Sequence, residues 1–204
     1  MSPKPADPRI RVALIEGAAR LIATEGPTGL TLRRLANEVG TSTMAVYTHF
    51  GGMDELRREV RREGFARLGE RLAAVPSTED PVADLGLLGA AYYVSAMDNS
   101  NLYRAMFMEG PVDDVDAVVG LDTFDQLIVG VQRCIDAGRF HSGDALVMAT
   151  QLWALAHGVV TLELANMLTP EQAQDCLRAG GNNLFRAFGD DPDDLERSLA
   201  AASG

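Results

Sequence analysis

A short polar face stands out within residues 41–52, which read TSTMAVYTHFGG. If this segment is a helix, Val46 and Phe50 are four residues apart and share one face. The opposite face then carries hydroxyl, phenol and thioether groups and no acid, on Thr43, Met44, Tyr47 and Thr48. Hydroxyls can meet phosphates or base edges and apolar atoms can meet thymine methyl groups, so this face suits the major groove of DNA. The alternative is that Tyr47 and His49 only pack on neighbouring helices.

A preceding helix must hold this face in place. Residues 31–40, TLRRLANEVG, are expected to form it and to stop at Gly40, because glycine permits a left-handed turn. Ala36 is small and lets the next helix approach closely. Val39 lies where a core shared with Val46 and Phe50 needs an apolar side chain. Two short helices joined by a tight turn over residues 31–50 are the helix-turn-helix pattern.

The stretch TLRRLANEVGTSTMAVYTHF resembles the DNA-binding region of the tetracycline-repressor (TetR) family. Members end their N-terminal three-helix domain in a Tyr-x-His-Phe-like segment, as residues 47–50 do here, and the resemblance covers about residues 8–70. It implies an all-α homodimer that binds a palindromic double-stranded DNA operator. It also implies release of the operator when a small-molecule inducer binds the C-terminal domain.

The resemblance further implies which residues meet DNA. By position, the residues facing bases would be Thr43, Met44 and Tyr47, with Ala45 in the same binding set. Those near phosphates would be Thr31, Arg33, Ser42, Thr48 and His49. The family often has a lysine at the start of the fourth helix to grip phosphate. This sequence has Met53 at that place, so one positive charge is missing.

The rest of the chain reads as helical. Asp7-Pro8 is a helix start and Gly26-Pro27 a helix end. Longer helices are predicted at about 81–98, 101–109, 114–137, 142–167 and 170–188, and the acidic tail after them is expected to fray.

The predicted fold class is therefore all-α. An N-terminal helix-turn-helix domain at 8–70 precedes a larger C-terminal helical domain at 78–190, which the resemblance assigns to ligand binding and dimerisation through its last two long helices.

Charge divides the chain in two. The net charge is −11, yet residues 1–72 hold 12 basic and 9 acidic residues, whereas residues 73–204 hold 6 basic and 20 acidic ones. This asymmetry suggests that the two parts have different functions, and that the N-terminal part can bind nucleic acid. The acidic part is mostly a solvated surface; the alternative is selection for a cationic ligand.

One C-terminal stretch, QLWALAHGVV, resembles the Trp-x-x-x-His-Gly signature of a TetR C-terminal subclass, the WHG type. Trp153 and His157 share a helix face, and Gly158 is expected to serve close packing because glycine costs roughly 1 kcal/mol inside a helix. Trp153 and His157 either belong to the core or contact a ligand. The candidate ligand-binding set is Tyr92, Met106, Phe107, Phe124, Leu127, Trp153 and His157.

Several functions find little support. There is no phosphate-binding glycine loop, no metal-ligand cluster and no catalytic constellation around the three histidines, so we expect no enzyme, no cofactor and no metal. Cys134 and Cys176 are expected to be buried small hydrophobes. No signal region or apolar run of about 18 residues is evident, which favours a cytoplasmic protein without a membrane partner. The rival functions are a ligand-independent architectural DNA-binding protein and an α-helical enzyme.

Overall fold

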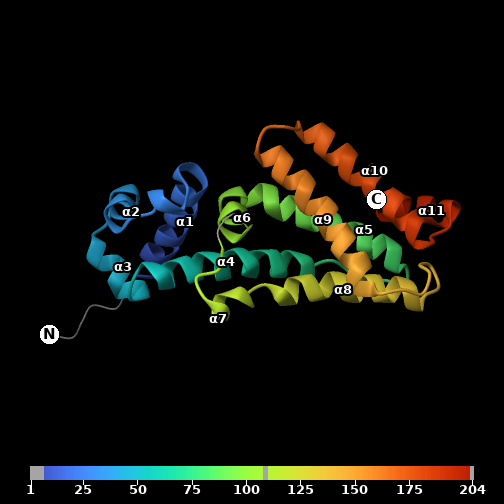
Figure 1. Cartoon of the computed structure of the whole chain (residues 1–204), viewed down its shortest axis with the longest axis horizontal. Helices are drawn as coiled ribbons and strands as arrows, with labels where there is room; N and C mark the ends of the chain where they lie inside the picture. Colours follow the sequence, from blue (N-terminus) through green and yellow to red (C-terminus); the bar gives the residue numbers. More distant parts are fainter. Residues whose placement is uncertain (1–6, 108–109, 203–204) are drawn as a thin grey trace. The chain divides into compact units, whose positions relative to one another are not determined.

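The computed structural model describes residues 7–107 and 110–202, and every regular element in these ranges is helical (Figure 1). The predicted all-α fold class is therefore confirmed. Two compact units divide the chain. Unit 1 comprises the residues up to Arg67 together with Asn99–Gly120, and unit 2 comprises Leu68–Asp98 and Leu121 onwards.

Unit 1 contains the helices α1 (Pro8–Glu25), α2 (Leu32–Val39), α3 (Thr43–Phe50), most of α4 (Met53–Ala73), α6 (Ser100–Phe107) and α7 (Asp114–Ala117), with a short 3-10 turn at Pro27–Gly29. α1 begins where predicted, since the Asp7 side chain accepts a hydrogen bond from the Arg9 backbone N–H at 2.9 Å. α1 packs against α2, α3 and α6. Their shared core includes Leu14, Leu35, Val46, Leu56 and Leu102.

Unit 2 contains α5 (Pro81–Asp98), α8 (Leu121–Asp136), α9 (Ala145–Leu164), α10 (Pro170–Phe188) and α11 (Pro192–Ala202). α9 packs against α5, α8 and α10, and α11 packs against α5 and α10. The core of this unit includes Val82, Val131, Phe140, Phe185 and Leu195. α10 starts with a reciprocal capping box between Thr169 and Gln172.

The helix expected at 114–137 is two helices, α7 and α8. Gly120 separates them with a φ of +91°, a conformation that glycine adopts readily. A β-carbon at Gly120 would also lie 2.2 Å from the ring of Phe65, so no larger residue fits without movement. Of the helix expected at 101–109, residues 101–107 are helical within α6, and the last two residues lie outside the described part of the chain.

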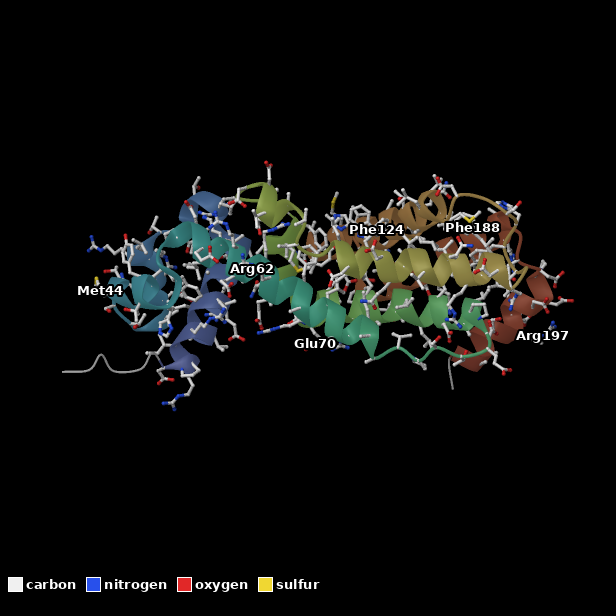
Figure 2. The ribbon with its side chains drawn as sticks, turned by 90° about the horizontal axis from the view of Figure 1, so that it is seen from below. Met44, Arg62, Glu70, Phe124, Phe188 and Arg197 are labelled. Carbon is white, nitrogen blue, oxygen red and sulfur yellow. The ribbon has the colours of Figure 1, made fainter. Side chains whose placement is uncertain are left out.

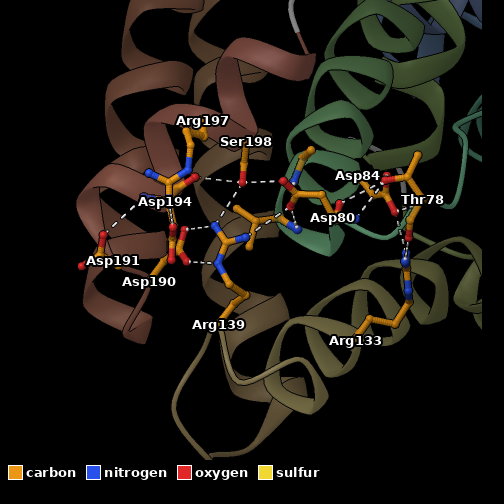
Figure 3. Close-up of polar contacts among 12 residues, drawn as sticks. Thr78, Asp80, Asp84, Arg133, Arg139, Asp190, Asp191, Asp194, Arg197 and Ser198 are labelled. Atoms are coloured by element: carbon orange, nitrogen blue, oxygen red, sulfur yellow. Dashed lines mark hydrogen bonds and ion pairs between the residues drawn. The ribbon is translucent and has the colours of Figure 1, made fainter.

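The prediction that the tail frays is wrong for residues 192–202, which form α11. Leu195 is 1% exposed in the core of unit 2, and an ionic network holds the helix (Figure 3). Arg139 donates to both carboxylate oxygens of Asp190, at 2.6 and 3.0 Å, and to the Ser198 hydroxyl at 3.0 Å. The Ser198 hydroxyl donates in turn to Asp80 of the α5 start at 2.7 Å. These partners lie far apart in sequence, so local composition gave no sign of them.

By length and composition, one described helix, α9, could cross a membrane, with a mean hydropathy of 1.5 over its best window. The expectation that no apolar run reaches this length is therefore wrong. Core helices of globular units have the same length and composition, and α9 packs on three other helices of unit 2. Only 28% of that window is buried, so α9 keeps much apolar surface exposed.

Candidate nucleic-acid interface and effector site

The helix α3, which carries the predicted DNA-binding face, is held by the core of unit 1. Val46 is 0% and Phe50 7% exposed, so the predicted inward face of α3 is confirmed. Gly40 ends α2 with a φ of +70°, in the left-handed conformation that the sequence predicted. Sequence reasoning missed Gly17 of α1, whose added β-carbon would lie 2.8 Å from the Val39 side chain. This glycine lets α1 and α2 approach closely and so fixes the platform that carries α3.

The opposite face of α3 points into solvent. Met44 is 65% and Tyr47 49% exposed, and the Met44 side chain projects away from the ribbon (Figure 2). Thr48 is exposed too, and its hydroxyl donates to the Met44 carbonyl oxygen at 2.9 Å. The other exposed members of the predicted DNA-binding set are Thr31, Arg33, Ser42 and Thr43, and the half-buried ones are Ala45 and His49. The structure thus brings all nine residues to α3 and to the start of α2.

The arginines around this face are mostly paired with acids. Arg34 lies 2.8 Å from Glu25 and 3.1 Å from Glu38, and Arg20 lies 2.9 Å from the same Glu38. Arg33, the next residue along α2, is exposed. The charges of Arg20 and Arg34 are therefore neutralised by acids of unit 1. The solvent-facing part of α3 has no acidic, lysine or arginine side chain.

Met53, where the sequence lacks the family's lysine, begins α4 and is half-buried. Its side chain packs against the core of unit 1, as Ala45 of α3 does. A methionine at this position therefore has a packing role, which the sequence pattern did not indicate.

A second constellation lies in unit 2, where three helices bring aromatic side chains together. The Trp153 and His157 rings of α9 are 5.2 Å apart, and the Phe124 ring of α8 lies edge-on 5.9 Å from Trp153. The Tyr92 hydroxyl of α5 is 3.4 Å from Nδ1 of His157. Burial lowers the pKa of His157 below its ordinary value, because the imidazolium would lose hydration. We call Tyr92, Phe124, Trp153 and His157 the aromatic cluster.

Not all of the predicted ligand-binding set joins this cluster. Leu127 packs against the core of unit 2, whereas Met106 and Phe107 belong to unit 1. Met106 is 4% exposed and lies against Gly64 of α4, and the Phe107 ring is 5.6 Å from the Phe65 ring. The set therefore divides between two units. The helical spacing of methionine and aromatic residues predicted that Met106 and Phe107 make apolar contacts. It could not predict that these contacts lie in unit 1.

Gly158 and the cysteines also depart from expectation. A β-carbon at Gly158 would meet no atom within 4 Å, so within this chain the residue serves no close packing. Cys134 is buried, and burial raises the pKa of its thiol to about 12, which makes it inert. Cys176 is exposed, so the burial predicted for it is wrong. No group of acids, histidines or cysteines suited to a metal ion occurs among the described residues.

Two family descriptions match this chain. Residues 14–60 match "Bacterial regulatory proteins, tetR family", and residues 85–180 match "Tetracyclin repressor-like, C-terminal domain". The chain belongs to the TetR family. The first match spans the helix-turn-helix, and the second includes Trp153, His157 and Gly158. The protein is thus a DNA-binding transcriptional regulator of the TetR family.

Relatives with curated names agree with this assignment. The uncharacterized HTH-type transcriptional regulator Rv0681 of Mycobacterium tuberculosis is 25% identical over 163 residues, 78% of this chain and 72% of the relative. The HTH-type transcriptional repressor AcnR of Corynebacterium efficiens is 38% identical over 63 residues, 31% of this chain and 34% of AcnR. The resemblance to AcnR covers about a third of each chain.

Solved structures of other proteins share the fold, among them a TetR family transcriptional regulator. The regulator PfmR of Thermus thermophilus aligns with a TM-score of 0.74 at 20% identity, covering 85% of this chain and 97% of PfmR. AibR, solved in complex with isovaleryl coenzyme A and operator DNA, aligns with a TM-score of 0.70 at 17% identity, covering 86% of this chain and 98% of AibR. At these identities the likeness extends to the fold alone.

Proposed function

We propose that this TetR regulator is a cytoplasmic repressor that binds a palindromic operator as a homodimer and leaves it when a small molecule binds. DNA binding is assigned to residues 8–70, and ligand binding and dimerisation to residues 78–190. No catalytic activity, cofactor or metal is part of the proposal. The repressor names of relatives such as AcnR support the direction of regulation.

The observation that carries the proposal is the exposed, uncharged face of α3. Met44 and Tyr47 stand clear of the protein surface on a helix whose other face is fixed in the core. A helix presented in this way fits the major groove, where a thioether and a phenol ring can contact thymine methyl groups. Thr31 and Ser42 can donate hydroxyl hydrogen bonds to phosphates, and Thr48 can do so once its hydroxyl rotates away from the Met44 carbonyl oxygen.

Selection of bound fragments from random duplexes tests this function. The recovered site should be an inverted repeat, and the affinity for it should fall steeply with salt because bound counterions are released from DNA. Tyr47→Ala should cost about 1–3 kcal/mol of discrimination between the selected and a scrambled duplex. Val12→Ala is the matched control, since Val12 is 47% exposed on α1 of the same unit. Equal affinity of the wild type for selected and scrambled duplexes rejects sequence-specific regulation.

The effector part of the proposal rests on the aromatic cluster of unit 2, which combines the Tyr92 hydroxyl, the His157 imidazole and the Trp153 indole N–H with apolar ring faces. A ligand that binds one conformer of the dimer more tightly shifts the separation of the two recognition helices, which must match one DNA turn of about 34 Å. AibR shows a family fold holding both a ligand and its operator. If no small molecule from a broad collection releases the selected duplex, the architectural alternative replaces the inducible one.

A further inference from the structure

The helices that build the aromatic cluster are short of positive charge. α5, α8 and α9 together carry one basic residue, Arg133, and its guanidinium lies 2.8 Å from Asp84. The same three helices carry six acids: Asp84, Asp98, Asp122, Asp125, Asp136 and Glu163. Unit 2 as a whole holds six arginines and no lysine against 17 acids.

This imbalance bears on which ligands the cluster accepts. An anion that leaves water must be paired with a cation or several donors, or it loses several kcal/mol of hydration. Five of the six arginines of unit 2 pair with acids, namely Arg71, Arg133, Arg139, Arg178 and Arg197. The sixth, Arg186, is exposed on α10, a helix that contributes no residue to the aromatic cluster. A carboxylate or phosphate ligand at the aromatic cluster would therefore meet ring faces, and the three helices that build the cluster offer it no Arg or Lys other than the paired Arg133.

The same groups favour a cation. Trp153, Phe124 and Tyr92 offer ring faces whose negative quadrupoles attract positive charge. Glu163, six residues beyond His157 on α9, accepts a hydrogen bond from the Tyr93 hydroxyl at 2.8 Å, so a carboxylate of α9 is held beside the residue that follows Tyr92. Burial, and after it the neighbouring Glu163, raise the pKa of Tyr93, so this phenol stays neutral. His157 is neutral near pH 7 because burial lowers its pKa, so it does not repel a cation.

We propose that the effector of this regulator is a lipophilic organic cation bound against the ring faces of Phe124 and Trp153, beside His157. The inference rests on the proposed function, since it names the ligand class of the effector unit. It sets this chain apart from AibR, whose ligand, isovaleryl coenzyme A, carries phosphates. It also assigns a function to the excess of acidic residues in unit 2, namely the attraction of a cationic ligand.

The chain offers its own probe for the test, because Trp153 is its one tryptophan. Tetraphenylphosphonium and tetraphenylborate have nearly the same shape and opposite charges. Titrated into the full-length protein, the phosphonium should change Trp153 fluorescence saturably and bind at least tenfold more tightly than the borate. Equal or tighter binding of the borate, or no saturable response to the phosphonium, overturns the proposal.

Two variants locate the binding site. Phe124→Leu removes one ring face and should weaken phosphonium binding about fivefold, whereas Val129→Met, at an exposed site on the same helix, should leave it unchanged. Glu163→Gln keeps an oxygen for the Tyr93 hydroxyl and removes the charge, and it should weaken binding about threefold. If the phosphonium binds as tightly to both variants as to the wild type, it binds elsewhere and the site is wrong.

Release of DNA separates this inference from the proposed function. Added to the protein on its selected duplex, the phosphonium should dissociate the complex at concentrations that saturate the Trp153 signal. Saturation without release supports the ligand class and counts against inducible repression. Release by anionic compounds and not by the phosphonium supports inducible repression and overturns the ligand class.

Discussion

Arg61 of α4 and Asp116 of α7 form an ion pair inside unit 1, with Nε 3.1 Å from Oδ2. Asp116 is fully buried and Arg61 is 8% exposed. The carboxylate also accepts a hydrogen bond from the Val112 backbone N–H at 2.9 Å, and the guanidinium lies 5.5 Å from the centre of the Phe65 ring. Neighbouring Arg58 pairs with Asp113 at 2.6 Å nearer the surface. Two ion pairs thus fasten the short α7 to the helix that follows the recognition helix.

Removing one partner of the buried pair should be costly. Asp116→Asn leaves the Arg61 charge buried without its counter-ion, and we expect unfolding free energy to drop by about 3–5 kcal/mol. Asp113→Asn is the matched control, because asparagine still caps α7 and the lost pair is exposed to solvent, so the drop should be much smaller. Urea unfolding followed by circular dichroism measures both. Similar losses in the two variants would show that burial does not set the strength of this pair.

Arg33 should contribute one phosphate contact. Arg33→Ala should weaken binding to all duplexes and reduce the magnitude of the salt slope by about one. Arg178→Ala removes the same charge from an exposed position on α10 and should leave the slope unchanged. Fluorescence anisotropy at several salt concentrations gives the slopes. An unchanged slope in Arg33→Ala removes this residue from the interface.

Met53 offers a gain-of-function test. Met53→Lys should tighten binding without changing sequence preference, and raise the magnitude of the salt slope by about one, because the long lysine stem can keep the apolar contact while its ammonium reaches phosphate. Met53→Leu retains packing without adding charge and should bind like the wild type. If the lysine variant loses stability and gains no affinity, the core contact of Met53 dominates.

The dimer interface is predicted on α9 and α10, and the structure sharpens which residues to change. Among the apolar residues of α9, Met148 and Val159 are buried within unit 2, whereas Leu146, Val147 and Leu162 are 40–51% exposed. Leu184 of α10 packs against the core, so changing it would confound folding with association.

Leu162→Glu should yield helical monomers with weak operator binding, since an isologous interface places the new charges in apolar surroundings. Val129→Glu, at a 59% exposed site on α8, should remain dimeric in sedimentation experiments. A dimeric Leu162→Glu would move the interface elsewhere.

The sequence predicted features set by local spacing and missed those set by distant partners. The four-residue spacing of Val46 and Phe50 identified the buried face of α3, and Asp7 with Pro8 identified the start of α1. The break at Gly120 depends on Phe65, 55 positions earlier, and α11 depends on Arg139. No local pattern contains such pairs.

The candidate effector site shows the same division. Trp153 and His157 are one helical turn apart, so their proximity followed from the sequence. By contrast, the contact of His157 with Tyr92 joins two residues that are 65 positions apart in the sequence. Met106 packs in unit 1 because the chain returns to that unit at Asn99. Neither could be predicted from local spacing.

The pKa of His157 makes stability depend on pH. In the unfolded chain its imidazole titrates near about 6.5, whereas burial lowers the pKa in the folded protein. Below about 6.5 the unfolded chain therefore binds more protons than the folded one, so this residue lowers the free energy of unfolding as the pH falls; above it both states are neutral and the contribution vanishes. His157→Gln should thus show a shallower loss of stability between about pH 6.5 and pH 5.

Trp153 fluorescence provides the direct reading of this titration, because the indole lies 5.2 Å from the imidazole. A protonated imidazole quenches a neighbouring indole, so the native protein should dim with a midpoint below about 6.5, and His157→Gln should not dim in this range. A native midpoint at or above the ordinary histidine value would contradict the burial of His157. It would also place a positive charge beside Trp153 near neutral pH, where the proposed cationic effector would then be repelled.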